Sequence, residues 1–112
     1  MAIYANIPID QGSSFASVVT VQDAAGLAFN LTGYTVRGQI RKSYASTSYV
    51  AFSCGVQPGV IGKIQITLSA AQTAALKAGR YVYDIEIVET ASGAVTRVVE
   101  GQVEVTPRVT RV

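Results

Sequence analysis

Hydrophobic and polar residues alternate with a period of two along most of the chain. Successive side chains of a β-strand point to opposite faces, so this alternation predicts strands with one buried and one solvated face. Seven strands are predicted, at residues 15–21, 27–31, 34–42, 48–54, 63–68, 80–89 and 95–105. Glycine-rich turn sequences separate them at intervals typical of a β-sandwich.

One helical segment interrupts this pattern. In SAAQTAALKAG, residues 69–79, Ser69 is followed three positions later by Gln72, the spacing of a capping box. Lys77 is expected in the last turn and Gly79 at the C-terminal cap. A helix this short does not persist alone, so the pattern predicts one packed helical turn between two strands.

The segment after this turn resembles the E–F corner of immunoglobulin-like domains. Tyr81 is then expected to be the corner tyrosine, and Tyr83 to occupy the place of the second core cysteine. The chain has no tryptophan and a single cysteine, which excludes an antibody-type domain. The predicted fold is all-β: an Ig-like antiparallel β-sandwich of about seven strands, with the helical turn between its E- and F-like strands.

Length and composition indicate one folded domain over residues 1–112. The chain is 49% hydrophobic and only 14% charged, against roughly 25% charged in typical soluble domains. Part of its surface is therefore expected to be covered by a partner. The net charge is +2 and the chain has no basic run, so no nucleic-acid binding is predicted. The alternative of a DNA-packaging factor would require a strong, salt-dependent affinity for DNA.

No stretch is long and apolar enough to predict a membrane span. The N-terminal MAIYANIPID lacks the pattern of a signal peptide, so synthesis in a cytoplasm is expected.

The candidate chemistry is sparse. The chain has no histidine and one cysteine, Cys54, so His-based triads, structural zinc and an intrachain disulfide are all excluded. A lone thiol without a histidine partner is typical of a packed residue. We expect no catalytic residues, no metal and no cofactor.

Asp84 and Glu86 stand two positions apart beside tyrosines, as the paired acids of a glycosidase could. Period-two alternation places both acids on the face opposite Tyr81 and Tyr83. In an Ig-like sheet this strand neighbours residues 34–42, so we expect cross-strand charge pairs with Arg37 and Arg41. Such pairs contribute roughly 0.2–1 kcal/mol each, which explains the spacing without catalysis.

The hydroxyl-rich SYASTSY at residues 43–49 is expected to be a polar loop. Its Tyr44 and Tyr49 could instead stack on sugar rings, which keeps a carbohydrate-binding or host-adhesion module open as an alternative.

Both ends of the chain are expected to be extended arms, at about residues 1–9 and 107–112, each containing a proline. They are more hydrophobic than free tails should be, so we expect them to pair with, or lie across, a neighbouring subunit. The residues expected to make these assembly contacts are Tyr4, Ile7, Ile9, Arg108, Val109, Arg111 and Val112.

The segments IPIDQGSSF, LTGYTVRGQIRKSY, LSAAQTAALKAGRYVYDIEI and VTRVVEGQVEVTPRVTR follow one another as in small virion structural proteins of tailed bacteriophages. The chain is most similar to those of contractile-tailed cyanophages, and related modules form N-terminal domains of phage baseplate and tail-fibre proteins. The resemblance implies a non-enzymatic virion protein, made in the host cytoplasm, that docks on the particle in multiple copies. Its partners would be the major capsid protein, for a head decoration, or tail and baseplate subunits, for an adaptor.

Overall fold

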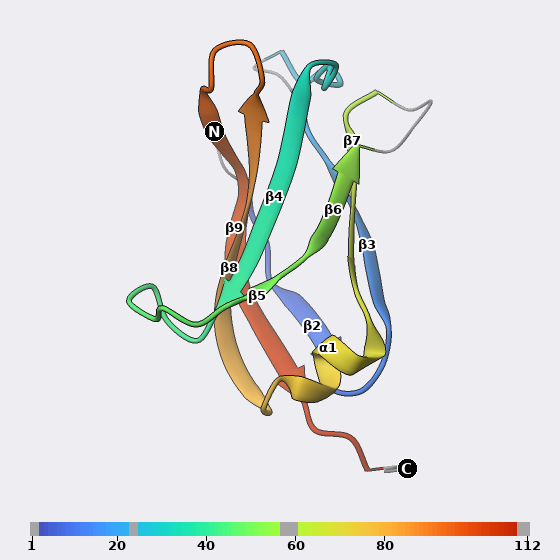
Figure 1. Ribbon diagram of the computed structural model, residues 1–112. Coiled ribbons are helices and arrows are strands. Elements are labelled where there is room, and N and C mark those ends of the chain that lie inside the picture. The colour runs from blue at the N-terminus through green and yellow to red at the C-terminus, as the bar shows by residue number, and fades with distance from the viewer. Residues whose placement is uncertain (1–2, 23–24, 57–60, 110–112) are drawn as a thin grey trace.

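The computed structural model describes residues 3–22, 25–56 and 61–109, which form two packed β-sheets (Figure 1). The first sheet has the order β1-β9-β8-β4-β5, with β2 also pairing with β9, and the second has the order β3-β7-β6. The elements are β1 Ile3–Tyr4, β2 Ile7–Asp10, β3 Phe15–Thr20, β4 Tyr34–Arg41, β5 Val50–Ala51, β6 Ser53–Val56, β7 Lys63–Leu68, α1 Ala70–Ala75, β8 Gly79–Glu89 and β9 Val95–Thr106. The predicted all-β sandwich is confirmed.

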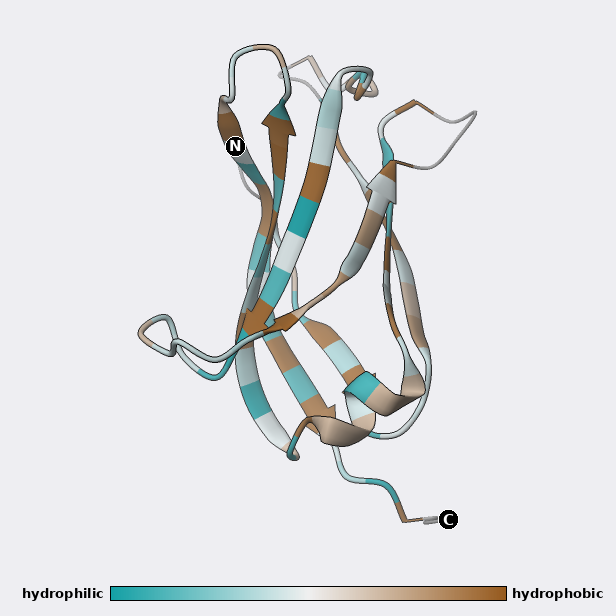
Figure 2. Cartoon of the chain, viewed as in Figure 1, coloured by the Kyte–Doolittle hydropathy of each residue, from teal (hydrophilic) through white to brown (hydrophobic). Residues whose placement is uncertain are grey.

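The core lies between the two sheets and follows the predicted alternation. Ile64 and Ile66 of β7 face Ile85 of β8 and Val103 of β9 across the interior, and all four are completely shielded from solvent. Hydrophobic and hydrophilic residues form bands along β4, β8 and β9 (Figure 2). Burial of these inward faces supplies the main driving force for folding.

The helical turn α1 begins with the expected capping box, in which Ser69 and Gln72 bond each other's backbone N–H groups. The helix ends earlier than expected: its C-cap is Leu76, not Gly79, because Leu76 turns to an extended conformation that buries its side chain. The Tyr81 hydroxyl then donates to the Lys77 carbonyl at 2.7 Å, the bond of a tyrosine corner.

The strand predicted at residues 48–54 divides between the two sheets. Val50 and Ala51 pair with β4 in the first sheet, and Ser53 begins β6, which pairs with β7 in the second. Phe52 lies at the crossing, where its buried ring contacts Phe15 and Tyr83.

The strand predicted at residues 27–31 is wrong. This segment forms a loop with one isolated bridge at Ala28, and Leu27 is 67% exposed although Leu31 is buried. Turn chemistry prevails here, because the Asn30 side chain accepts the Thr32 N–H and Gly33 adopts φ +85°.

The N-terminal arm, expected at about residues 1–9 to pair with or lie across a neighbouring subunit, instead joins the chain's own first sheet over residues 3–10. β1 and β2 pair in parallel with the chain's own β9, and Ile9 is only 1% exposed, opposite Val105. Ile7 packs against the same core. Pro8 is tolerated because β2 lies at the edge of the sheet.

At the other end, residues 107–109 leave β9 and extend beyond the sandwich (Figure 1). The Arg108 N–H bonds the Gln11 side chain at 3.5 Å, and Val109 is 96% exposed. Arg111 and Val112, the other residues expected in this arm, lie outside the described part of the chain.

Candidate functional site

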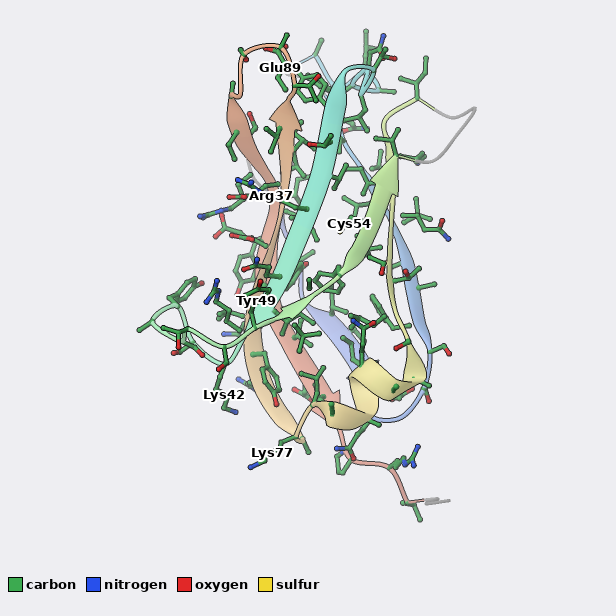
Figure 3. All side chains as sticks on the ribbon, in the orientation of Figure 1. Arg37, Lys42, Tyr49, Cys54, Lys77 and Glu89 are labelled. Carbon is green, nitrogen blue, oxygen red and sulfur yellow. The ribbon has the colours of Figure 1, made fainter. Side chains whose placement is uncertain are left out.

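The outer face of the first sheet is hollowed over β4, β8 and β9, with a volume of about 420 Å³. We call this feature the outer hollow. The side chains that line it on the strands are Arg37, Gln39, Arg41, Val82, Asp84, Glu86, Arg97 and Glu100, joined by Tyr44 from the loop at residues 42–49. The Arg37 side chain projects away from the second sheet (Figure 3). The hollow therefore gathers six charged side chains from three neighbouring strands.

One ion pair and one three-residue ion cluster line the outer hollow. Arg37 lies opposite Glu86 in the strand register, and its Nε is 2.9 Å from Glu86 Oε1. Arg97 Nε is 3.4 Å from Asp84 Oδ2, and its Nη1 is 3.7 Å from Glu100 Oε1. Both acids singled out from the sequence are thus held by arginines.

Arg41 does not form the expected ion pair with either acid. The register places it opposite Val82, two residue pairs further along the strands than Asp84, which lies opposite Gln39. Its guanidinium bonds Gln39 Oε1 at 2.9 Å and the Ser46 carbonyl, and it lies over the Tyr49 ring. It remains close enough to Asp84 to act on that carboxylate electrostatically.

Arg97, rather than Arg41, forms the ion pair with Asp84, and the sequence pattern did not predict this contact. Strict alternation assigns Arg97 to the same inward face as Val99. The strand register shifts at Ile85/Glu86, so that Val99 pairs with Ile85 and Arg97 pairs with Glu86. Val98 is the extra residue of this β-bulge, and the bulge turns Arg97 outward. The doublet of valines, Val98 and Val99, both buried, is the local sign of the shift.

Asp84 lies on the middle one of the three strands, between Gln39 of β4 and Glu100 of β9 in the register. Its partial burial raises the pKa of the carboxyl above its usual value, and the nearby Glu86 and Glu100 raise it further, whereas Arg97 and Arg41 oppose the shift. Asp84 is therefore a partly desolvated acceptor, available to a hydrogen-bond donor from solution.

The two tyrosines proposed for sugar stacking have different positions. Tyr44 is 82% exposed and lines the outer hollow. Tyr49 lies outside that lining, with its ring centroid 5.0 Å from the Arg41 guanidinium carbon. The loop that carries them projects away from the sandwich beside the first sheet (Figure 1).

Cys54, the single thiol of the chain, is partly buried. Burial raises the pKa of the Cys54 thiol to about 11, so the thiol stays protonated and unreactive at neutral pH. Among the described residues, no group of three or more histidine, cysteine, aspartate or glutamate side chains is arranged to hold a metal ion. The same part of the chain contains no helix with the length and apolar character needed to cross a membrane.

The outer face of the second sheet, which we call the neutral face, differs sharply in composition. Small and uncharged side chains cover it, and its single charged residue on the strands, Lys63, bonds the Thr20 hydroxyl at 2.7 Å. The residues that alternation turns outward on these strands are Ala16, Val18, Thr20, Ser53, Gly55, Lys63, Gln65 and Thr67. Strands β3 and β6 accordingly show little strong hydrophilic colour (Figure 2).

Comparison with known proteins supports the fold alone. No family model matches the chain, and no similar curated protein was found. Among solved structures, InlP of Listeria monocytogenes matches with a TM-score of 0.50 and 15% identity, over 94% of this chain and 28% of that one. AggA, the major subunit of aggregative adherence fimbriae type I of Escherichia coli, matches with a TM-score of 0.39 and 11% identity, over 92% and 89%. The chain thus spans little more than a quarter of the InlP chain.

Proposed function

We propose that this chain is a non-catalytic structural module that docks, in multiple copies, on other proteins of a tailed-bacteriophage particle. The placement on a virion rests on the sequence resemblance, and the docking role rests on the neutral face. Soluble domains usually spread charge over their whole surface. Here the charged side chains of the strands concentrate on the first sheet, and the second sheet presents Val18 and Gln65 side by side without charge.

The neutral face suits a permanent protein contact for a physical reason. Covering a charged group costs more free energy than covering a serine or threonine hydroxyl, and covering alanine and valine side chains is favourable. Charged residues are depleted at the centres of protein interfaces for the same reason. A particle protein with a flat uncharged surface is therefore the partner that this face fits.

The first test is to count this protein against the major capsid protein in purified particles by quantitative mass spectrometry. Hundreds of copies would indicate a head decoration, and a dozen or a few dozen would indicate the neck, tail or baseplate. Absence from the particle would refute the virion role.

The docking surface is tested by Val18→Glu. Val18 is 51% exposed on an edge strand, so the variant should fold, but an unpaired carboxylate would be buried in the contact. We expect at least about a tenfold loss of particle-bound copies. Gln102→Glu adds the same charge to an exposed position of the first sheet and is the control. Equal incorporation of both variants would contradict docking through the neutral face.

A further inference from the structure

The outer hollow has the size and position of a ligand site. Its volume of about 420 Å³ falls within the 300–1,000 Å³ typical of small-molecule sites. Its walls are side chains of β4, β8 and β9, the central strands of the first sheet. Strands hold side chains more rigidly than loops do, so the arrangement is prepared before a ligand arrives.

The hydrogen-bonding groups in the outer hollow match hydroxyl groups. Three arginines provide only donors, three carboxylates provide only acceptors, and the Gln39 amide provides both. A sugar hydroxyl both donates and accepts, so neighbouring hydroxyls can bond an arginine and a carboxylate together. Because the positive and negative charges are equal in number, the hollow does not favour a strongly anionic or cationic ligand.

The acceptors retain capacity for a ligand. Arg97 approaches Asp84 at 3.4 Å and Glu100 at 3.7 Å, longer than the roughly 2.7–2.9 Å of strong charge-assisted bonds. Each carboxylate can accept about four hydrogen bonds. Asp84 therefore retains hydrogen-bond acceptor capacity for incoming hydroxyls.

An aromatic ring stands at the margin of the same hollow. Tyr44 exposes 82% of its surface, and a tyrosine face can pack on the C–H face of a sugar ring. Arg41 anchors the loop that carries it, by bonding the Ser46 carbonyl and covering the Tyr49 ring. This anchoring reduces the ordering cost of binding.

The β-bulge at Val98 provides a second argument for a built site. The bulge interrupts the alternation of β9 next to Arg97. As a result, the Arg97 side chain points into the hollow. Bulges are frequent next to binding sites because they redirect a side chain.

From these observations we propose that the outer hollow binds an uncharged saccharide, with Asp84 and Arg97 holding its hydroxyls and Tyr44 stacking on its ring. The site lies on the sheet opposite the neutral face, so a docked copy can present it to solution. Each site would bind weakly, and many copies on one particle would give avidity. The proposal is independent of the particle, because the isolated chain carries the whole site.

The test uses the purified chain, isotopically labelled for NMR and titrated with neutral hexoses, N-acetylhexosamines and deoxyhexoses. We expect saturable amide shifts confined to β4, β8, β9 and residues 42–49. With the best sugar, Asp84→Asn and Tyr44→Ala should each weaken binding at least tenfold. Glu104→Gln, which alters an acid of the same sheet outside the hollow, should bind as the wild type does.

Several results would overturn the proposal. Among them are no saturable shift with any of these sugars, shifts elsewhere, or affinities that the Asp84 and Tyr44 variants leave unchanged. Binding only to anionic polysaccharides, lost at moderate salt, would indicate attraction to surface arginines instead. Shifts produced only by extended peptides would assign the hollow to a protein partner.

Discussion

The hydroxyl groups of two tyrosines anchor β8, one to backbone four residues earlier and one to the N-terminal segment. Tyr81 closes the corner after α1 through the Lys77 carbonyl, and Tyr83 donates to the Ala5 carbonyl at 2.6 Å. Burial raises the pKa of Tyr83 to about 12, with a smaller contribution from Tyr4, so its hydroxyl remains a donor. Both bonds connect β8 to backbone segments whose positions the alternation of hydrophobic and polar residues does not predict.

Tyr81→Phe should lower the free energy of unfolding by about 1 kcal/mol, the usual net value of such a hydrogen bond. Equilibrium urea unfolding with an unchanged m-value would measure it. Tyr34→Phe is the matched control, because its hydroxyl bonds Glu89 at 3.4 Å and a smaller loss is expected there. Equal losses of free energy of unfolding in the two variants would mean that the Tyr81 hydrogen bond stabilises the fold no more than the Tyr34 bond does.

The hydrogen-bonding role of Thr73 could not be predicted from the sequence around it. Thr73 is completely buried within α1, accepts the Gly12 N–H at 3.0 Å and donates to the Ser13 carbonyl at 2.8 Å. The capping residues Ser69 and Gln72 were predictable because they act within one helical turn. The role of Thr73 was not, since its partners lie about 60 residues earlier in the chain.

At the scale of elements, the N-terminal strand pairing is the main departure from expectation. A hydrophobic extended segment can add to the sheet of a neighbouring subunit or to its own sheet, and the backbone hydrogen bonds are alike in both cases. The structure places β1 and β2 against the chain's own β9. Gly101 permits this close approach, since a Cβ there would collide with the Ala5 carbonyl oxygen.

Gly101→Ala should therefore displace the N-terminal strands and destabilise the fold by about 1–3 kcal/mol, as overpacking usually does. Hydrogen exchange at the Ala5 amide, which now bonds the Glu100 carbonyl at 2.9 Å, should accelerate. Gly55→Ala is the control, because its added methyl meets open space. Unchanged exchange at Ala5 in Gly101→Ala would show that this segment is held by other contacts.

At the scale of the whole molecule, the outer faces of the two sheets differ in charge. Ion pairs gather on the first sheet around Asp84, and the second sheet carries the neutral face. This separation supports both proposals, because a molecule docked by one sheet leaves the other accessible.

The charge arrangement around Asp84 predicts a specific pH dependence. Because its pKa is raised in the folded state, folding favours the protonated form, and its contribution to stability falls as pH rises through the folded pKa. Asp84→Asn should thus equal or slightly exceed the wild-type free energy of unfolding at neutral pH. The difference should stay under about 0.5 kcal/mol, since the side chain is partly solvated.

The difference between Asp84→Asn and wild type should vanish below about pH 3, where the aspartate is protonated in both states. Denaturant unfolding across this range would measure it. A loss of stability at neutral pH that recovers in acid would mean that the Arg97 contact outweighs the burial of Asp84.

The sequence by itself determined the sandwich class, the inward faces of β4, β7 and β8, the capping box of α1 and the tyrosine corner. These features follow from strand periodicity and from contacts within a few residues, which act the same way in any chain. Only the tertiary structure decided the pairing of residues 3–10 with β9, the division of the strand at Phe52 and the bulge that turns Arg97 outward. Each depends on the register between segments far apart in sequence, where packing of the whole core selects among local conformations of similar energy.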